Sequence, residues 1–507
     1  TEITVDHQTK RLITDSGYTL KSVLAKNKIL FLKTTANLST GGTAIDVTDS
    51  VHPANVHIAE RAIRIVGLDI GGVDIVSPDI TTPLSENNGG IVELNAAPGF
   101  RMHLQPTKGL PRNVAEPVLD MLFPPGSSST IPIIAVTGTN GKTSVVWFIS
   151  QICELNNEFI KTYGTLGYYK NGKKILNSSL TTPELEILYQ SAFLKKKKNL
   201  YNFAFEVSSH SLAQNRIKNF PIDIAAITNI SHDHLDYHKT FENYKKSKLR
   251  LFTHELKKNG IAIINDNIKG AQTLKNKLIK KNQVISYGKK NSDVNIIYIK
   301  NKIEIKIFSK KYLISLLNYS PIELENIACA ICCCLSLNIY IKDIIKVLPK
   351  IIKPKGRLEE VGKLKNNSII YVDYAHTPDA LKNALISKTF LKSKPNVVFG
   401  CGGERDEGKR LLMGSIANRY ASKVYITDDN PRNEDPKKIR KAILSKCKRA
   451  IEIPDRKKAI EESINDLQKN EILIIAGKGH EKNQVRKNQI RFFDDVQVAK
   501  YFIMKKI

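Results

Sequence analysis

The segment around residue 140 constrains the fold of this chain more than any other. A short apolar run, Ile131–Val136, leads into the glycine-rich stretch Thr137-Gly-Thr-Asn-Gly-Lys-Thr-Ser144, and apolar residues at helical spacing follow from Val145. A strand, a glycine-rich turn and a helix in this order are the context in which such a turn binds phosphate. The alternative, a turn that is merely tight, leaves the Gly-Lys-Thr at its end unexplained. We therefore predict an α/β domain that binds a nucleotide.

The residue types of this phosphate loop suit ATP and Mg²⁺. Its glycines let backbone N–H groups approach phosphates, and the N-terminal end of the helix favours negative charge. Lys142 is expected to bridge the β- and γ-phosphates, and Thr143 to hold Mg²⁺. The first glycine of the general pattern is replaced by Val136, so the loop is a variant. The predicted ATP contacts in the loop are Gly138, Thr139, Asn140, Gly141, Lys142, Thr143 and Ser144.

Polar motifs follow six further apolar strands along the chain. They are Phe203–His210, Thr228–His238, Asp373–Asp379, Gly400–Arg410, Thr427–Arg432 and Ala476–Glu481. Open α/β sheets bind their ligands at the carboxyl ends of the strands. We therefore expect two α/β domains that face one cleft.

Two of these motifs contain candidate metal ligands. Glu206 can supply a carboxylate oxygen and His234 an imidazole, whereas His232 and His238 are weaker candidates that can also cap or pack. Phosphoryl transfer to a carboxylate brings several anions together, and it needs Mg²⁺, lysines and backbone dipoles to neutralise them. Lys248 lies in a predicted helix, Phe241–Phe252, and its periodicity alone indicates a solvated surface lysine.

A change of composition marks a domain boundary near Thr130. Up to that residue the chain has 11 Lys and Arg against 13 Asp and Glu, and the remainder has 67 against 36. The stretch Phe123–Thr130 has the Pro, Gly and Ser content of a linker. We predict three domains, residues 1–130, 131–352 and 353–507, which suits a chain of 507 residues.

The net charge of +29 raises the question of a nucleic-acid partner. The basic residues are mostly lysines mixed with Ile and Asn, and they lack interleaved aromatic residues. We interpret most of them as solvated faces and expect no nucleic-acid partner. A basic, nucleic-acid-binding ATPase remains an alternative.

Four of the seven cysteines cluster as Cys329, Cys332, Cys333 and Cys334. A metal site is one interpretation, but the run is apolar and has no second Cys pair or His partner, so buried free thiols in a reducing cytoplasm are favoured. No apolar run is long enough to span a bilayer, and the polar start does not resemble a signal peptide. We expect a cytoplasmic monomer without membrane insertion. The chain begins at Thr1 rather than Met, which suggests a fragment.

The N-terminal segment has a different character. Alternation predicts two neighbouring strands, Gly72–Val76 and Ile91–Asn95, on which Asp74, Glu93 and Asn95 could meet as oxygen ligands for Mg²⁺. Two motifs resemble the end of the ATP-grasp domain of cyanophycin synthetase. They are Leu38-Ser-Thr-Gly-Gly-Thr-Ala44 and Glu93-Leu-Asn-Ala-Ala-Pro-Gly-Phe-Arg-Met-His103. The region that supplies the nucleotide-clamping lysines of that domain is absent. The resemblance implies a partial ATP-grasp α+β segment without its own ATP-grasp activity.

From the phosphate loop onward, about three quarters of the chain resembles the Mur ligase family. The matching words occur in order: Thr181-Thr-Pro, Glu206-Val-Ser-Ser-His, Asp233-His-Leu-Asp-Tyr-His, Tyr374-Ala-His-Thr-Pro-Asp-Ala, Gly402-Gly-Glu-Arg-Asp-Glu-Gly-Lys-Arg, Asp429-Asn-Pro-Arg and Ala476-Gly-Lys-Gly-His-Glu. The resemblance implies a central ATPase domain, a C-terminal Rossmann-like domain and an ATP-dependent amide ligase of peptidoglycan synthesis. Such a ligase activates the D-glutamate side chain of a UDP-linked muramoyl dipeptide as an acyl phosphate and joins it to meso-diaminopimelate.

The resemblance also assigns roles to single residues. Lys248 aligns with a carbamylated lysine that ligates a second Mg²⁺, and it joins Lys142, Glu206 and His234 as a catalytic candidate. Positions matching the muramoyl-dipeptide site are Thr181, Thr182, Ser208, Gln214 and Arg216. Positions matching nucleotide contacts are Asn326, Arg357 and His376. The diaminopimelate site is matched by Arg405, Asp429, Asn430, Arg432, Gly477 and Glu481. There, Arg432 would pair with a carboxylate and Glu481 would meet an ammonium.

Two departures from the family pattern accompany these matches. The segment Ser320–Asn326 keeps the last Asn but not the usual Gly and Phe-Asn before it. The family's own N-terminal domain, which grips the uridine nucleotide, is replaced by the ATP-grasp tail, as in a natural recombinant, a cloned chimera or an assembly join. We therefore expect ATP binding with poor use of the uridine-linked donor. Cyanophycin synthetase, which adds Arg to an aspartate side chain, also places an ATP-grasp module before a Mur-like domain and is the main rival.

Overall fold

The computed structural model describes residues 5–33, 42–122, 131–178, 180–192, 201–299, 302–315, 319–387, 394–487 and 489–506. The chain divides into two compact units, Thr1–Ser128 and Ser129–Ile507. The predicted linker Phe123–Thr130 and the motif residues Leu38–Gly41 lie outside the described residues.

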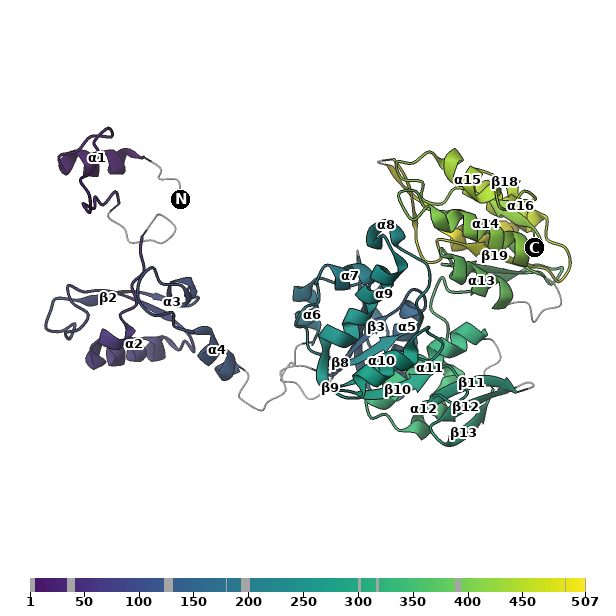
Figure 1. The fold of residues 1–507 in the computed structure, drawn as a ribbon, viewed down its shortest axis with the longest axis horizontal. Helices are drawn as coiled ribbons and strands as arrows, with labels where there is room; N and C mark the ends of the chain where they lie inside the picture. The colour runs from purple at the N-terminus through teal and green to yellow at the C-terminus, as the bar shows by residue number, and fades with distance from the viewer. Residues whose placement is uncertain are drawn as a thin grey trace. The chain divides into compact units, whose positions relative to one another are not determined.

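The first unit, purple to blue in Figure 1, is small and has little core. Its elements are helices α1 (His7–Asp15), α2 (Pro53–Val66), α3 (Arg101–Leu104) and α4 (Ala115–Leu122), a 3₁₀ turn (Thr48–Ser50), and strands β1 (Gly72–Val76) and β2 (Gly90–Asn95). Among its described residues, Ile13 and Leu84 are the only buried apolar side chains.

The two strands of the first unit pair antiparallel, with Asp74 opposite Glu93. Asn95 donates a hydrogen bond from Nδ2 to Asp74 Oδ2 at 3.3 Å. The two predicted neighbouring strands are therefore present. The side chains of Asp74, Glu93 and Asn95 lie close together on them. Asp74 and Glu93 are both exposed. That they bind Mg²⁺ stays a prediction.

The first sheet of the second unit has eleven strands, in the order β13-β12-β11-β10-β9-β8-β3-β7-β4-β5-β6. Its parallel centre consists of β4 (Phe159–Gly164), β7 (Tyr201–Glu206), β3 (Ile133–Thr137), β8 (Ile222–Ile227), β9 (Leu256–Asn265) and β10 (Gln283–Tyr287). The outer strands are β5 (Gly167–Lys170), β6 (Lys173–Leu176), β11 (Val294–Ile299), β12 (Lys302–Ile307) and β13 (Lys310–Ile314). The strand with the phosphate loop thus lies within the parallel centre.

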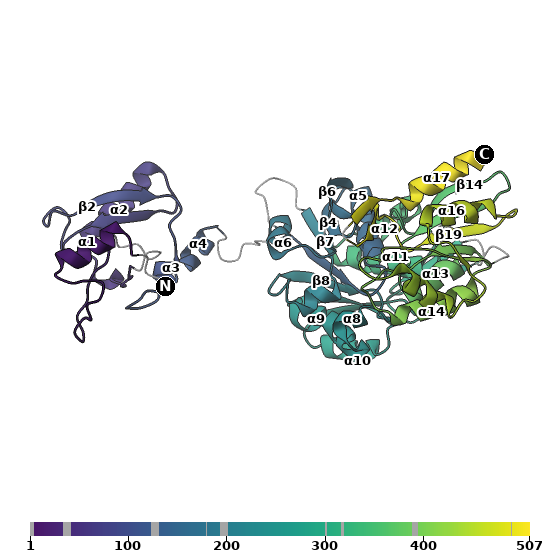
Figure 2. The ribbon, with the colours of Figure 1, turned by 90° about the horizontal axis from the view of Figure 1, so that it is seen from above.

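Helices cover both faces of this sheet (Figures 1 and 2). Successive residues of β3 enter different cores: Ile134 and Val136 pack with α5 (Lys142–Leu155), α11 (Pro321–Ser336) and α12 (Ile341–Val347). Ile133 and Ala135 pack with α6 (Leu185–Ala192), α7 (Ser209–Ala213) and α10 (Ala271–Leu278). A strand that is buried on both faces must be apolar throughout, which explains the continuous run before the loop.

The second sheet has six strands, in the order β14-β15-β19-β16-β17-β18. They are β14 (Glu359–Lys363), which is antiparallel, and the parallel β15 (Ile369–Asp373), β19 (Ile472–Ala476), β16 (Asn396–Phe399), β17 (Val424–Ile426) and β18 (Ile451–Glu452). One face packs with α13 (Pro378–Ser387), α14 (Gly408–Tyr420) and α15 (Pro436–Leu444), and the other with α16 (Arg456–Asn465) and α17 (Asp495–Lys506). A hairpin, β20 (Asn483–Arg486) and β21 (Gln489–Phe492), extends from this layer.

The connection between the two sheets runs from the 3₁₀ turn Leu348–Lys350 to β14. The predicted boundary between residues 352 and 353 falls within it. The contacts group both sheets into one unit, so the three-domain division remains our proposal. No helix within the described ranges is long and apolar enough to cross a membrane.

Candidate active site

The phosphate loop leaves the carboxyl end of β3 and is held against the loop after β8. Thr139 N–H donates to Asn229 O and Asn140 N–H to Asn229 Oδ1, both at 2.9 Å. Gly138, with φ +141°, has no room for a side chain, because a Cβ would lie 1.8 Å from Thr228 Oγ1. Gly141, with φ +87°, would bring a Cβ to 2.4 Å from Asn326 Oδ1. The glycines are therefore required by close approach as well as by conformation.

Lys142, the first residue of α5, points back over the loop. Its Nζ donates to Gly138 O at 2.9 Å and to Thr139 O at 3.0 Å. Burial lowers the pKa of Lys142, and the neighbouring carboxylates of Glu206 and Asp233 oppose that shift. The half-buried Lys142 amine, whose Nζ donates to two carbonyl oxygens of the loop, is poised to turn to a stronger anion such as a triphosphate.

Thr143 and Glu206 place two oxygens at the base of the loop. Thr143 Oγ1 donates to Glu206 Oε2 at 3.0 Å, and Thr165 N–H donates to Glu206 Oε1 at 2.7 Å. Hard oxygen donors of this kind fit Mg²⁺, which keeps several waters and takes ligands from substrate phosphates. Among the residues that the structure describes, no three His, Cys, Asp or Glu side chains gather into a metal cage.

Lys248 is not the surface lysine that its periodicity indicates. It lies in α9 (Phe241–Arg250), is 1% exposed, and donates from Nζ to Gly138 O at 2.8 Å. Burial, followed by repulsion from Lys142, lowers its pKa well below the usual value. The prediction from periodicity was wrong because α9 is rich in charged residues, so the pattern does not reveal which face packs beneath the loop. The role that the family resemblance implies for Lys248, a carbamylated metal ligand, stays a prediction.

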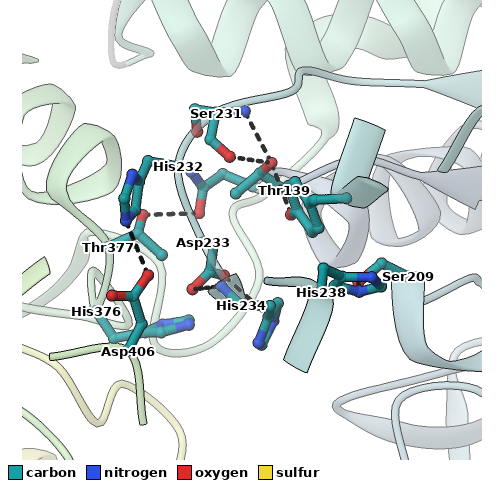
Figure 3. A network of polar contacts seen from close by, with 12 residues as sticks. Thr139, Ser209, Ser231, His232, Asp233, His234, His238, His376, Thr377 and Asp406 are labelled. Atoms are coloured by element: carbon teal, nitrogen blue, oxygen red, sulfur yellow. Dashed lines mark hydrogen bonds and ion pairs between the residues drawn. The ribbon is translucent and has the colours of Figure 1, made fainter. Parts of the chain in front are cut away.

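The histidines after β8 occupy different places (Figure 3). His234 immediately precedes α8 (Leu235–His238), and its Nε2 lies 3.2 Å from Asp233 Oδ2; burial lowers its pKa to about 3, although that carboxylate opposes the shift. His232 pairs through Nε2 with Asp406 Oδ2, 2.8 Å away, from the loop between β16 and α14. His238 packs inward and bonds Ser209 Oγ at 3.0 Å. Only His234 lines the cleft beside the phosphate loop.

Residues of the second sheet close the cleft from the opposite side. Arg357 Nη2 donates to Thr143 Oγ1 at 3.2 Å, and Thr377 Oγ1 to Asn140 Oδ1 at 3.2 Å. The cleft has a volume of about 260 Å³. Predicted site residues that line it are Thr139, Asn140, Gly141, Lys142, Thr143, Thr181, Glu206, Ser208, His234, Lys248, Arg357, His376, Arg405, Asp429, Asn430, Arg432, Gly477 and Glu481.

The remaining predicted residues lie around this cleft. Ser144 and Asn326 line a second cavity, which shares Asn140, Gly141 and Arg357 with the first. Thr182 is buried, and its Oγ1 accepts a hydrogen bond from Ser208 N–H at 2.9 Å. Arg216 Nη1 donates to the backbone oxygen of Thr182 at 3.3 Å. Gly138 forms the loop itself, and Gln214 is exposed at the end of α7. Gln214 therefore belongs to the rim at most.

The far end of the cleft combines both charges. Arg432 donates from Nη1 to Gly403 O at 2.6 Å, and Asn430 from Nδ2 to Glu481 Oε2 at 3.2 Å. Burial raises the pKa of Glu481, and the nearby Asp429 raises it further. A ligand carrying both carboxylate and ammonium groups would meet complementary partners here.

Sequence reasoning missed several residues that line the cleft: Asp233, Tyr374, Asp406 and Lys409. Lys409, at the start of α14, is only 6% exposed. Its position in the sequence does not distinguish it from a solvated lysine on a helix. All four residues lie inside motifs that carry the family resemblance. Their position after strand ends was the available signal, but it does not tell which side chain turns inward.

Two family models match the chain: "Mur ligase middle domain" over residues 136–334 and "Mur ligase, glutamate ligase domain" over residues 356–479. A UDP-N-acetylmuramoyl-L-alanyl-D-glutamate–2,6-diaminopimelate ligase from Rickettsia bellii is 41% identical over 393 residues, 75% of this chain and 81% of that protein. The ligase of the same name from Buchnera aphidicola subsp. Schizaphis graminum is 38% identical over 399 residues, 75% of this chain and 79% of that protein.

Solved structures agree with the sequence relatives. A structure titled with the same ligase name has a TM-score of 0.53 and 30% identity, over 77% of this chain and 81% of that chain. A pseudomurein peptide ligase type C from Methanothermus fervidus has a TM-score of 0.55 at 17% identity, over 75% of this chain and 79% of that chain, which shows a shared fold.

Proposed function

This chain belongs to the Mur ligase family, whose members are ATP-dependent ligases, and on that premise we propose that it adds meso-2,6-diaminopimelate to UDP-N-acetylmuramoyl-L-alanyl-D-glutamate. One observation carries the proposal: a single cleft joins the phosphate loop, through Lys142 and Glu206, to a mixed-charge end with Arg432 and Glu481. Relatives that bear the name of this activity supply the identity of the substrates.

The first half of the reaction activates the donor carboxylate. An oxygen of the D-glutamate side chain attacks the γ-phosphorus of ATP, ADP leaves, and an acyl phosphate forms. Lys142 and the loop amides neutralise the phosphates, and Thr143 with Glu206 would hold Mg²⁺, which supplies further positive charge when it is bound. Ser208 and Thr181 line the same wall and are proposed to hold the donor.

Lys248 is proposed to carry a carbamate. Burial favours its neutral amine, and a neutral amine is the form that reacts with CO₂. The amine nitrogen forms a bond to the carbon of CO₂ and gives up one proton to solvent, which leaves an anion where a neutral amine stood, beside the loop residue Gly138. That anion would serve as a further ligand for Mg²⁺ beside Glu206 and His234.

The second half of the reaction uses the far end of the cleft. The amine of diaminopimelate attacks the acyl carbon, the tetrahedral intermediate collapses, and phosphate leaves. Arg432, with Arg405 nearby, is proposed to bind a carboxylate of the amino acid through the guanidinium fork. Glu481 is proposed to bind its distal ammonium, and Asn430 holds that carboxylate in place by donating from Nδ2 to Glu481 Oε2 at 3.2 Å.

The first unit adds nothing that we can connect to this reaction. We propose that residues 1–130 are a partial ATP-grasp segment that binds the uridine-linked donor weakly, and that residues 131–352 and 353–507 are the two ligase domains. Seven free, buried cysteines suit the reducing cytoplasm, where we place the protein.

The experiment is ATP turnover with three substrate sets. Muramoyl dipeptide with diaminopimelate should release phosphate, and release should require both compounds. An aspartate polymer with Arg, the substrates of cyanophycin synthetase, and single-stranded nucleic acid should not stimulate release. The variant Lys142→Met should lose at least about 10²-fold in rate. Turnover with either of the other two sets, and none with the first, would replace the proposal by the corresponding rival.

A further inference from the structure

Tyr374 stands between the two ends of the cleft. It follows β15 directly, and it lines the cleft together with Thr143, Arg357 and Glu481. Its ring and its hydroxyl face different partners. The Arg357 guanidinium lies 4.5 Å from the ring centroid, and the hydroxyl donates to Glu481 Oε1 at 3.3 Å. Neither the sequence motifs nor the similar proteins assign a role to Tyr374.

The ring holds the residue that reaches the phosphate loop. Arg357 Nη2 donates to Thr143 Oγ1 at 3.2 Å, so the guanidinium touches the loop on one side and the ring on the other. The Nε of Arg357 is buried and has no hydrogen-bond partner among the described residues. A guanidinium over an aromatic face gains electrostatic attraction that grows as water is excluded. The ring is therefore a principal support of Arg357 on its outer side.

The hydroxyl holds the residue that is proposed to meet the amine substrate. Besides Tyr374, the carboxylate of Glu481 takes Asn430 Nδ2 at 3.2 Å and lies 3.6 Å from the Nζ of Lys478, a fully buried lysine. Asn430 is itself oriented, since its Oδ1 accepts Val485 N–H at 3.0 Å and Lys478 Nζ at 3.2 Å. Asn430 and Lys478 both contact Oε2 of Glu481, whereas Tyr374 donates to Oε1. Tyr374 is the donor on the side of Arg357.

Packing leaves Tyr374 little freedom to shift alone. Its ring lies 4.5 Å from that of His376 and 5.1 Å from that of His480, centroid to centroid. Gly479, at φ +53°, approaches so closely that an added Cβ would lie 2.7 Å from the Tyr374 Cβ. If a bound nucleotide moves Arg357 and thereby the Tyr374 ring, the hydroxyl must move with the ring. The hydrogen bond that this hydroxyl donates to Glu481 must then change as well.

We propose that Tyr374 is a positioning residue that couples the nucleotide site to the amine site. Its ring fixes Arg357 against the phosphate loop, and its hydroxyl orients Glu481 toward the ammonium of the incoming amino acid. The second half of this inference rests on the proposed function, because the identity of the amine comes from there. The first half concerns nucleotide binding alone and can be tested without any amine.

Two substitutions separate the ring from the hydroxyl. Tyr374→Phe keeps the ring and removes one hydrogen bond to a carboxylate, so the KM for diaminopimelate should rise about tenfold while the KM for ATP stays unchanged. Tyr374→Leu removes both, so the KM for the amine should rise and the affinity for a non-hydrolysable ATP analogue, measured by calorimetry, should also fall severalfold. The matched control is Tyr425→Phe, which removes another buried tyrosine hydroxyl from a carboxylate, Asp466, in the core of the same sheet. It should change neither value.

A double-mutant cycle locates the effect at Glu481. Tyr374→Phe should cost the amine KM far less in a Glu481→Gln background than in the wild type, because the hydroxyl acts through that carboxylate. Equal rises in both KM values for Tyr374→Phe, or an unchanged amine KM, would overturn the inference. If the wild type does not turn over diaminopimelate, the proposed function fails. The calorimetric comparison of the Phe and Leu variants still decides the nucleotide half, and equal affinity in both variants would overturn it.

Discussion

Several histidines around the cleft are buried in their neutral form. Burial lowers the pKa of His376 and of His238 to about 4, and that of His234 and of His480 to about 3. The unfolded chain takes up protons on these rings near pH 6.5, whereas the folded protein does not. Their contribution to stability is therefore intact above about pH 6.5. It is lost progressively as the pH falls from there toward the folded-state values.

His238 allows this loss to be measured without touching the residues proposed for catalysis. Its pKa is lowered first by burial and then by His210 and Lys248. In His238→Gln, the free energy of unfolding should fall less between pH 7 and pH 5 than in the wild type, by about 2 kcal/mol. Urea unfolding at the two pH values measures the difference. The control His254→Gln, at an exposed ring, should behave as the wild type. An identical pH dependence in His238→Gln would refute the account of this residue.

Single residues also show what the sequence could and could not reveal. The presence of a glycine-rich loop between a strand and a helix was predictable, because glycines, a preceding apolar run and a following helical pattern mark it in the sequence; the distant residues that hold it, Thr228, Asn229 and Asn326, were visible only in the fold. The burial of Lys248 was not predictable, because it depends on the packing of α9 under a loop 110 residues away in sequence. Tyr374 and Lys409 lie inside sequence motifs that carry the family resemblance. Only the folded structure shows that their side chains line the cleft.

At the scale of elements, the parallel strands that carry motifs were predicted from their apolar runs, and the antiparallel pair β1 and β2 from its alternation, whereas the antiparallel strands at the edges of the eleven-stranded sheet were not predicted. Continuous apolar runs such as those of β17 and β19 are typical of strands buried on both faces. Strands β11, β12 and β13 extend the first sheet at its edge, and both β12 and β13 contain two lysines beside their apolar residues. In a lysine-rich chain, such an edge pattern does not stand out from a solvated loop.

Helix α11 carries a testable consequence of its packing. Cys329, Cys332, Cys333 and Cys334 are fully buried, in one core with Cys153 of α5. Apolar burial keeps the thiols protonated and unreactive, since it raises the pKa of Cys332, Cys333 and Cys334.

We expect a thiol reagent to modify these cysteines only after unfolding in urea, and EDTA to leave the unfolding temperature unchanged. Thiol titration with and without urea, and thermal unfolding with and without chelator, are the measurements. A clear fall in the unfolding temperature with EDTA would restore the metal interpretation of this cluster.

At the scale of the whole molecule, the second unit contains every residue that we propose to bind ATP, and it has core clusters of its own. Deleting residues 1–130 should therefore change the affinity for ATP less than about threefold, or well under 1.4 kcal/mol. Calorimetric titration of both proteins with a non-hydrolysable ATP analogue tests this.

Replacing the first unit with a genuine uridine-binding domain should raise turnover by orders of magnitude, because remote binding energy helps to position the reacting carboxylate. A full-length protein that already saturates at low donor concentration would show that the first unit binds the donor after all.

The central claim is that this cleft activates a carboxylate as an acyl phosphate. The most direct measurement is the fate of an ¹⁸O label in the D-glutamate side-chain carboxylate of the muramoyl dipeptide during turnover with ATP and diaminopimelate. The carboxylate oxygen that attacks the γ-phosphorus leaves with it, so the account predicts one labelled oxygen in each phosphate released. Phosphate that is free of the label, formed together with the amide product, would contradict it.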